Sequence, residues 1–237
     1  MKPHSRSESI AQYVRHIIFT RPCLLENLRL GIINYSALSK LLKKDLEKLL
    51  DTKVSESAVK IALIRFAKPL VKQSEIPDIK FAKVMAASSL SLIDDIEVIT
   101  IDSRKARNVV TKILQLAKTA RFFQFTQGVE SFTLMIDRET AEQIHGLLKN
   151  VGMLSFMKGQ AAILMNSPPE IISTPGIISY LTFLLSSRGI NVTQIISCHR
   201  DTIFIVDMKD ALQVYSLLRD AIETFRWYSE NSSSSHS

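Results

Sequence analysis

The stretch from Ala161 to Leu218 constrains the fold of this chain more than any other. Its apolar residues form a short continuous run, then recur at helical spacing, then form two strand-like runs, and finally return to helical spacing. The order is therefore strand, helix, strand, strand, helix, and one further strand would complete a ferredoxin-like βαββαβ unit. The expected elements are residues 161–165, 175–188, 192–197, 202–206 and 209–218.

Particular residues mark the start and the end of the first expected helix. Thr174 can cap it, and Pro175 suits the first helical position because the missing N–H of proline has no partner there. Arg188 and Gly189 close the helix, since glycine readily takes the left-handed conformation at a helix end. The sequence thus predicts a helix that begins at Thr174 and Pro175, after a turn at 166–169.

Four short segments of this stretch are Ser167–Pro168, Thr174–Ile177, Gly189–Val192 and Ile196–Ser197. In these segments the chain resembles the ACT domain, a small regulatory module that binds amino acids, and in particular the ACT region at the C-terminus of aspartokinases. The resemblance implies a ferredoxin-like fold and an amino acid effector. The kinase domain that precedes this region in aspartokinases has no counterpart here, so the chain is expected not to be an enzyme.

The resemblance also implies where an effector would bind, near the loop before the first helix and the strand after it. The effector-binding residues that it implies are Ser167, Thr174, Pro175, Gly176, Ile177, Asn191 and Val192. Physical chemistry supports this, because the N–H groups at a helix start favour a carboxylate and Asn offers both a donor and an acceptor. The alternative is that Thr174–Gly176 only caps the helix and Asn191 only turns the chain.

Residues 93–157 repeat the order of elements seen in residues 158–228. Phe132–Asp137 aligns with Thr202–Asp207 at an offset of 70 positions, and four apolar helix positions align at the same offset. Such self-similarity indicates a duplicated unit. We therefore expect an α+β chain in which a degenerate ACT-like domain, 93–157, precedes an ACT domain, 158–228, both ferredoxin-like.

Two further features concern the end of the second domain and the helix entrance of the first. Phe225, Trp227 and Tyr228 are expected to form the last short strand, and the serine-rich residues 229–237 are expected to be disordered. The first domain has Asp102 near its helix entrance, where a carboxylate would repel a bound carboxylate. We therefore expect a single type of site, or one shared across a homodimer.

Residues 1–92 carry all of the excess positive charge. They hold 16 Lys and Arg against 8 Asp and Glu, whereas residues 93–237 hold 14 against 15. This asymmetry favours an acidic partner for the N-terminal part, nucleic acid first. The alternative is a solvated basic helix surface.

The N-terminal part has the pattern of a helical domain. Asn34 caps a helix from Tyr35 to about Leu50, and Ser55 caps a following helix that runs through Ala67 and is limited by Pro69. Two helices joined by a short turn are typical of a helix-turn-helix. Residues 89–92 alternate like a strand and would form either a wing of this domain or an extra strand beside the next domain.

A helix-turn-helix places the early residues of its second helix against base edges. The candidates here are Ser57, Lys60 and Arg65, with Lys40, Lys43, Lys44 and Lys53 for phosphates. Glu56 opposes this interpretation, and so do the apolar residues around much of the second helix, which would bury it. The alternative is a domain that contacts protein.

Other signals are absent from the sequence. No uninterrupted apolar run is long enough for a membrane span, and the N-terminus has no apolar secretory signal, which favours a cytoplasmic location. Cys23 and Cys198 lie in different expected domains, so a disulfide is not expected. No motif for a cofactor, a metal or a catalytic nucleophile occurs, and Cys198–Asp201 is expected to be a hairpin turn.

These observations predict an amino-acid-sensing regulatory protein without catalytic residues. In the first hypothesis it is a transcriptional regulator in which an effector bound between the ACT domains alters DNA binding by residues 1–92. In the alternative it is a non-catalytic subunit that docks on an amino-acid biosynthetic enzyme.

Overall fold

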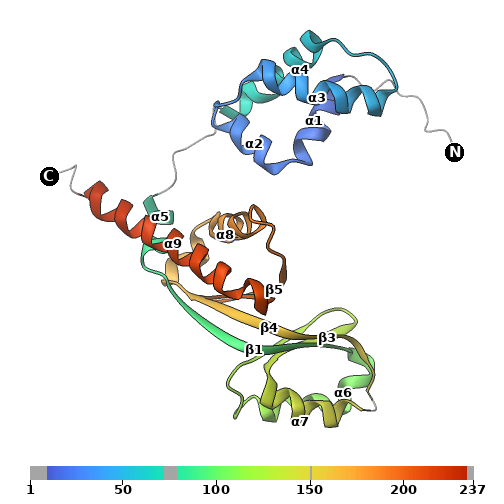
Figure 1. Ribbon diagram of the computed structural model, residues 1–237, viewed down its shortest axis with the longest axis vertical. Helices are drawn as coiled ribbons and strands as arrows, with labels where there is room; N and C mark the ends of the chain where they lie inside the picture. The colour runs from blue at the N-terminus through green and yellow to red at the C-terminus, as the bar shows by residue number, and fades with distance from the viewer. Residues whose placement is uncertain (1–9, 72–78, 150, 234–237) are drawn as a thin grey trace. The chain divides into compact units, whose positions relative to one another are not determined.

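The computed structural model describes residues 10–71, 79–149 and 151–233 (Figure 1). The chain divides into two compact units, Met1–Ile76 and Pro77–Ser237. We call them the helical unit and the sheet unit. No helix within the described residues is long and apolar enough to cross a membrane.

The helical unit contains four described helices around one apolar core. They are α1 (Ile10–Phe19), α2 (Pro22–Arg29), α3 (Tyr35–Leu50) and α4 (Glu56–Val71). The Asn34 side chain accepts hydrogen bonds from the N–H groups of Ser36 and Ala37, at 3.1 and 3.0 Å, so the predicted cap of α3 is confirmed. Ser55 caps α4 in the same way, by accepting from the N–H of Ala58 at 3.1 Å.

Helix α4 is only partly buried, in contrast to the expectation that its apolar circumference would bury it. Val59 and Leu63 belong to the fully buried core, while Ile61 and Ile64 are 52% and 42% exposed. The helix also continues through Pro69 to Val71. The apolar residues of α4 therefore point in two directions, into the core and into solvent.

The sheet unit is an α+β structure with one six-stranded antiparallel sheet. Its elements are α5 (Ile79–Ala86), β1 (Ser89–Asp102), α6 (Ser103–Leu116), β2 (Phe123–Gln127), β3 (Ser131–Asp137), α7 (Arg138–Leu148), β4 (Met153–Asn166), η1 (Pro169–Ser173), α8 (Ile177–Ser186), β5 (Val192–Cys198), β6 (Asp201–Asp207) and α9 (Met208–Ser233). The strand order is β2-β3-β1-β4-β6-β5. The order βαββα occurs twice, from β1 to α7 and from β4 to α9.

Strands β1 and β4 are long and belong to both halves of the sheet. The C-terminal part of β1 pairs with β3, whereas Ser89–Ile93 pairs with Ala162–Asn166 of β4. Each half therefore has the strand order of a ferredoxin-like unit, β2-β3-β1-β4 and β5-β6-β4-β1. Residues 89–92 thus extend the sheet instead of forming a wing, which is the second of the two alternatives expected for them.

The shared strands correct several expectations. The boundaries expected at 92/93 and 157/158 fall inside β1 and β4, because one strand continues where the sequence pattern suggested two. The last strand expected at Phe225, Trp227 and Tyr228 does not form, since α9 runs through these residues and β1 supplies the fourth strand instead. Residues 229–233 are helical rather than disordered, and 234–237 lie outside the described residues.

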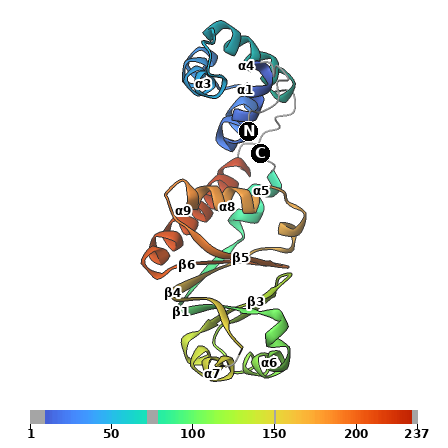
Figure 2. The ribbon, with the colours of Figure 1, turned by 90° about the vertical axis from the view of Figure 1, so that its right-hand side faces the viewer.

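The two halves of the sheet pack face to face. Helices α6 and α7 cover one half and α8 and α9 cover the other (Figure 2). Ile99 faces α6 and α7, and Phe204 faces α8 and α9. Their neighbours Val98 and Ile205 point to the opposite face of each strand and meet in one buried cluster. The unit therefore has two helical layers outside two sheet layers.

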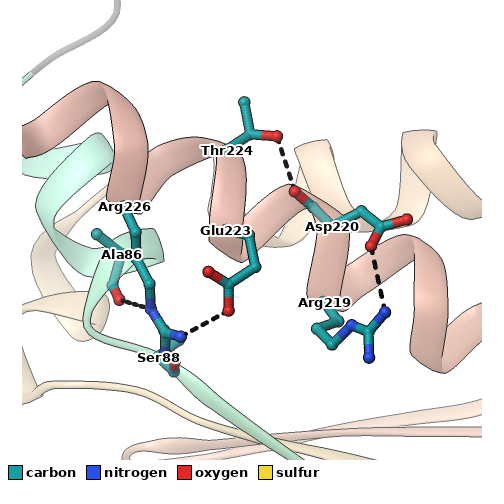
Figure 3. A network of polar contacts seen from close by, with 7 residues as sticks. All are labelled: Ala86, Ser88, Arg219, Asp220, Glu223, Thr224 and Arg226. Carbon is teal, nitrogen blue, oxygen red and sulfur yellow. Dashed lines mark hydrogen bonds and ion pairs between the residues drawn. The ribbon is translucent and has the colours of Figure 1, made fainter. Parts of the chain in front are cut away.

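Arg226 of α9 binds the C-terminal end of α5. Arg226 donates from Nε to the carbonyl of Ala86 and from Nη2 to that of Ser88, both at 2.9 Å (Figure 3). It also pairs with Glu223 at 2.8 Å. Carbonyls at the end of a helix lack partners within the helix, so this guanidinium stabilises the C-terminus of α5.

We predict that Arg226→Met lowers the free energy of unfolding of the sheet unit by about 1–2 kcal/mol, because two backbone carbonyls lose a charged donor. Arg219→Met is the matched control on the same helix. Within the described residues Arg219 pairs only with Asp220, at 3.8 Å and on the surface (Figure 3), so its loss should cost about 0–0.5 kcal/mol. Urea unfolding followed by circular dichroism checks this, and equal losses in both variants would contradict it.

Candidate functional site

A cavity of about 510 Å³ opens at the N-terminus of α8 in the sheet unit. Helix η1 forms one wall, the first turn of α8 a second, and the β5–β6 turn a third. Its lining residues are Ile171, Ile172, Thr174, Pro175, Gly176, Ile177, Ile178, Ser179, Ser197 and His199. Four of the seven predicted effector-binding residues are among them, namely Thr174, Pro175, Gly176 and Ile177.

The chain between β4 and α8 differs in detail from the predicted helix entrance. Pro169 opens η1, and Thr174 ends it by donating its hydroxyl to the carbonyl of Glu170 at 2.8 Å. The cap of α8 is Gly176, with φ +92°, a left-handed conformation that favours glycine. Neither Thr174 as the cap nor Pro175 as the first helical residue is correct, because the chain makes one more turn before α8.

The entrance of α8 leaves donors facing the cavity. Gly176 has no side chain and supplies no side-chain hydrogen bond to the first turn. The first backbone bond of the helix runs from the N–H of Tyr180 to the carbonyl of Gly176, at 2.8 Å. The N–H groups of Ile177, Ile178 and Ser179 precede it and have no carbonyl one turn back. Since all three residues line the cavity, this end of the helix favours a carboxylate there.

The other three predicted residues do not line the cavity. Ser167 is buried, and its hydroxyl is 2.9 Å from that of Ser88. Its carbonyl accepts from Nε of Arg200 at 2.8 Å, which fastens the end of β4 to the β5–β6 turn. Asn191 is exposed and Val192 packs against the apolar core. The structure therefore gives Ser167 a positioning role and places Asn191 and Val192 away from the cavity wall.

Sequence reasoning missed six lining residues: Ile171, Ile172, Ile178, Ser179, Ser197 and His199. Ile178 and Ser179 follow directly from the helix start and could have been included. Ser197 ends the fourth resembling segment, and His199 lies in the expected hairpin turn, with φ +54°. Cys198 is exposed and does not line the cavity. Among the described residues, no three His, Cys, Asp or Glu are grouped so that they could hold a metal ion.

Helix α5 lies behind the entrance of α8. A Cβ placed on Gly176 would meet the ring of Phe81 at 3.8 Å. Phe81 packs with Tyr180 of α8 and Phe225 of α9, with ring centroids 5.6 and 5.4 Å away. Burial in this aromatic cluster raises the pKa of Tyr180 above its ordinary value. The entrance of α8 therefore rests on α5, the first described element of the sheet unit.

One buried hydroxyl beside the cavity lacks a partner. Thr202 is fully buried, and its Oγ1 has no hydrogen-bond partner among the described residues. Thr202 lies directly opposite Ser197 in the β5–β6 pairing, and Ser197 lines the cavity. Buried polar groups normally have partners, so the Thr202 hydroxyl is an exception among the buried polar groups of the described residues.

The corresponding helix start in the other half of the sheet is closed to an anion. Asp102 caps α6 by accepting from the N–H of Arg104 at 2.9 Å. Hydrogen bonds from the Arg104 side chain and backbone lower the pKa of Asp102 below its ordinary value. A carboxylate of the chain itself thus occupies this helix start.

The helical unit presents most of the predicted DNA-binding residues on its surface. Lys40, Lys44, Lys53, Ser57 and Arg65 are exposed. Lys43 pairs with Glu47 at 3.8 Å, and Lys60 donates to the hydroxyl of Ser36 at 2.8 Å. Lys60 of α4 therefore forms a hydrogen bond to α3.

Comparisons with known proteins agree with the geometry of this part of the chain. The family model described as ACT domain matches residues 155–220, which include the whole cavity wall. A search of the curated proteins gave no match.

Several solved structures are similar to part of this chain. Aspartate kinase from Clostridium acetobutylicum is 18% identical with a TM-score of 0.47, and the match covers 56% of this chain and 34% of that one. The regulatory subunit of aspartate kinase from Thermus thermophilus is 17% identical with a TM-score of 0.44, covering 56% and 97%. A putative C-terminal regulatory domain of aspartate kinase from Porphyromonas gingivalis is 15% identical with a TM-score of 0.45, covering 57% and 96%. The chain thus spans about a third of the first of these proteins.

The domain assignment rests on the family model rather than on these distant structures. That model covers the C-terminal half of the sheet, from β4 into α9, and the cavity at the start of α8. Residues 155–220 of this chain therefore match the ACT domain family.

Proposed function

We propose that the chain is a regulatory protein that senses an amino acid, without catalytic activity, and that the amino acid binds in the cavity at the start of α8. The observation that carries this proposal is the uncapped first turn of α8, which faces a cavity inside a segment that matches the ACT domain. The carboxylate of the ligand would accept hydrogen bonds from the N–H groups of residues 177–179.

A thermal-shift screen of the twenty amino acids against the full chain tests this proposal. A ligand that binds only the folded state raises the melting temperature, by an amount that grows with its concentration relative to Kd. The expected result is that at least one amino acid stabilises the sheet unit in this way. No shift with any of the twenty at millimolar concentration would overturn the proposal.

We further propose that the two halves of the sheet unit, which share β1 and β4, are a pair of ACT-like domains, and that the chain forms a homodimer. The repeated βαββα order supports the pair, as does the 70-residue offset between the bounds of β3 and β6. The anion-binding helix start of the second half has no equivalent in the first, where Asp102 occupies it. We therefore expect one type of site per chain. Light scattering on the full chain tests the homodimer, which should have twice the mass of one chain.

For the output of the sensor we propose DNA binding by the helical unit. Exposed cations on α3, α4 and the turn between them support this function. The alternative, docking on an enzyme as a regulatory subunit, is favoured by a different observation: Ile61 and Ile64 are exposed on α4, the helix expected to enter the groove. Exposed isoleucines suit a protein partner better than a base edge.

A gel shift with duplex DNA at increasing salt separates these two outputs. DNA binding through several cations should weaken steeply with salt, by a slope of about −0.9 per phosphate contact. We predict that Lys43→Glu with Lys44→Glu abolishes the shift. The matched control, Lys112→Glu with Lys209→Glu, places the same charge change on the sheet unit and should leave it largely intact. Absence of a shift for the native chain at low salt favours the docking subunit.

A further inference from the structure

We infer that the cavity at the start of α8 selects an amino acid with an aliphatic side chain, such as leucine, isoleucine or valine. This inference rests on the proposed function, since it names the chemical class of the ligand for the same site. The inference follows from two properties of the cavity wall: many of its residues are aliphatic, and none of them is Asp, Glu, Lys or Arg.

Aliphatic residues form much of the wall. They are Ile171, Ile172, Pro175, Ile177 and Ile178. Ile177 is buried in the core, but Ile172 is 65% exposed although it is a large apolar residue beside the cavity mouth. An exposed isoleucine on a short 3-10 helix gains nothing from the fold itself, whereas an apolar ligand would remove it from water.

The wall also holds no fixed charge. None of the ten lining residues is Asp, Glu, Lys or Arg. Glu170 is next to the wall in sequence but does not line the cavity, and Arg200 donates its Nε to the carbonyl of Ser167. A lysine or arginine ligand would therefore find no carboxylate for its side chain. An aspartate or glutamate ligand would find one helix start for two negative charges.

The neutral polar groups of the wall can bind the carboxylate and the ammonium group that all amino acids share. The N–H groups of residues 177–179 would receive the carboxylate. Ser197 and His199 line the cavity from the β5–β6 turn, and the Ser197 hydroxyl and the His199 ring can accept hydrogen bonds from an ammonium group. The side chain of the ligand would then contact Ile171 and Ile172 of η1.

Calorimetric titration of the full chain with L-leucine, L-lysine, L-aspartate and L-alanine tests the inference. Leucine is expected to bind at least about tenfold more tightly than alanine, because a few methylene groups in an apolar pocket discriminate by this factor or more. Lysine and aspartate should bind more weakly than leucine. Leucinamide, which lacks the carboxylate, should not bind measurably.

Substitutions at the wall sharpen the test. Ile172→Asp should weaken leucine binding by at least about tenfold, because an apolar contact is lost. It should strengthen lysine binding, because the new carboxylate can pair with the side-chain ammonium of lysine. Leu212→Asp is the matched control, since Leu212 is 75% exposed on α9 and does not line the cavity. It should bind leucine as the native chain does. Circular dichroism establishes that both variants fold, and Ile172→Ser replaces Ile172→Asp if that variant does not.

The outcomes separate the inference from the proposed function. Tighter binding of lysine or aspartate than of leucine by the native chain overturns the aliphatic class while amino acid sensing stands. Equal leucine binding by the Ile172→Asp and Leu212→Asp variants also overturns it. Failure of all twenty amino acids to bind removes the proposed function itself.

Discussion

Phe204→Ala is expected to lower the free energy of unfolding of the sheet unit by about 3–5 kcal/mol, the range for truncating a buried phenylalanine. Phe204 is fully buried in the middle of β6, a strand paired on both sides. Its ring faces α8 and α9 and belongs to the same cluster as Ile177 at the cavity wall. The substitution removes the largest fully buried side chain in this cluster and leaves a cavity that a paired central strand cannot collapse.

Scanning calorimetry with a second variant shows where this loss acts. Leu46 is fully buried in the separate core of the helical unit, so Leu46→Ala should cost about 2–5 kcal/mol there. Because the two units have separate cores, we expect each substitution to lower the melting temperature of its own unit. A single transition that both variants shift equally would contradict this division of the chain.

Asp137→Ala is expected to cost the sheet unit about 2–4 kcal/mol. Asp137 is buried and caps α7 by accepting from the N–H and the hydroxyl of Thr140, at 2.9 and 3.0 Å. It also accepts from the N–H of Phe122 at 3.1 Å. Loss of a cap costs about 1 kcal/mol, and an unpaired buried N–H about 1–3 kcal/mol more.

The repeat supplies the control for this prediction. Asp207 stands 70 positions after Asp137 and is half-exposed. Of the residues that the structure describes, only Lys209 donates a backbone hydrogen bond to its side chain, at 3.0 Å. Asp207→Ala should therefore cost about 0.5–1 kcal/mol in urea unfolding. Equal costs at the two positions would show that the extra bonds of Asp137 contribute little.

The stability conferred by Asp137 should depend on pH in a definite direction. Burial acts to raise the pKa of Asp137, but hydrogen bonds from the N–H groups of Thr140 and Phe122 and from the Thr140 hydroxyl outweigh it and lower the pKa below its ordinary value. The ionised form is therefore the one that stabilises the fold. Its contribution is complete above the unfolded pKa, near 4, and is lost as the pH falls through the lower folded pKa. Asp137→Asn should flatten this acid limb of the stability curve.

Local signals in the sequence predicted most individual elements. Asn34 and Ser55 fix the starts of α3 and α4, because a side chain that caps a helix acts on its own neighbours in the chain. Alternation and helical spacing likewise gave the order of elements in the sheet unit. Periodicity does not identify the partner of a strand, however. Asp94–Asp95 has the composition of a turn, yet Asp95 takes φ +51° within a continuous β1, where the register with β4 shifts.

The same distinction between local signals and tertiary contacts applies to the residues of the site. Thr174–Ile177 could be placed from the sequence because its residues are adjacent and shape one helix start. Ile171 and Ile172 lie on a 3-10 helix too short to produce a period, and their exposure is visible only in the fold. Ser197 and His199 reach the cavity only because β5 and β6 bring their turn beside α8. Asn191 and Val192 were expected by analogy of position, and neither lines the cavity.

The most direct measurement is the amide NMR spectrum of the isotope-labelled full chain during titration with leucine. We predict progressive shifts of the Ile177, Ile178 and Ser179 amides, since their N–H groups would receive the carboxylate. We predict no comparable shift at Arg104, whose N–H is already held by Asp102. Binding of leucine or any other amino acid that leaves the amides of residues 177–179 unmoved would contradict carboxylate binding at the start of α8.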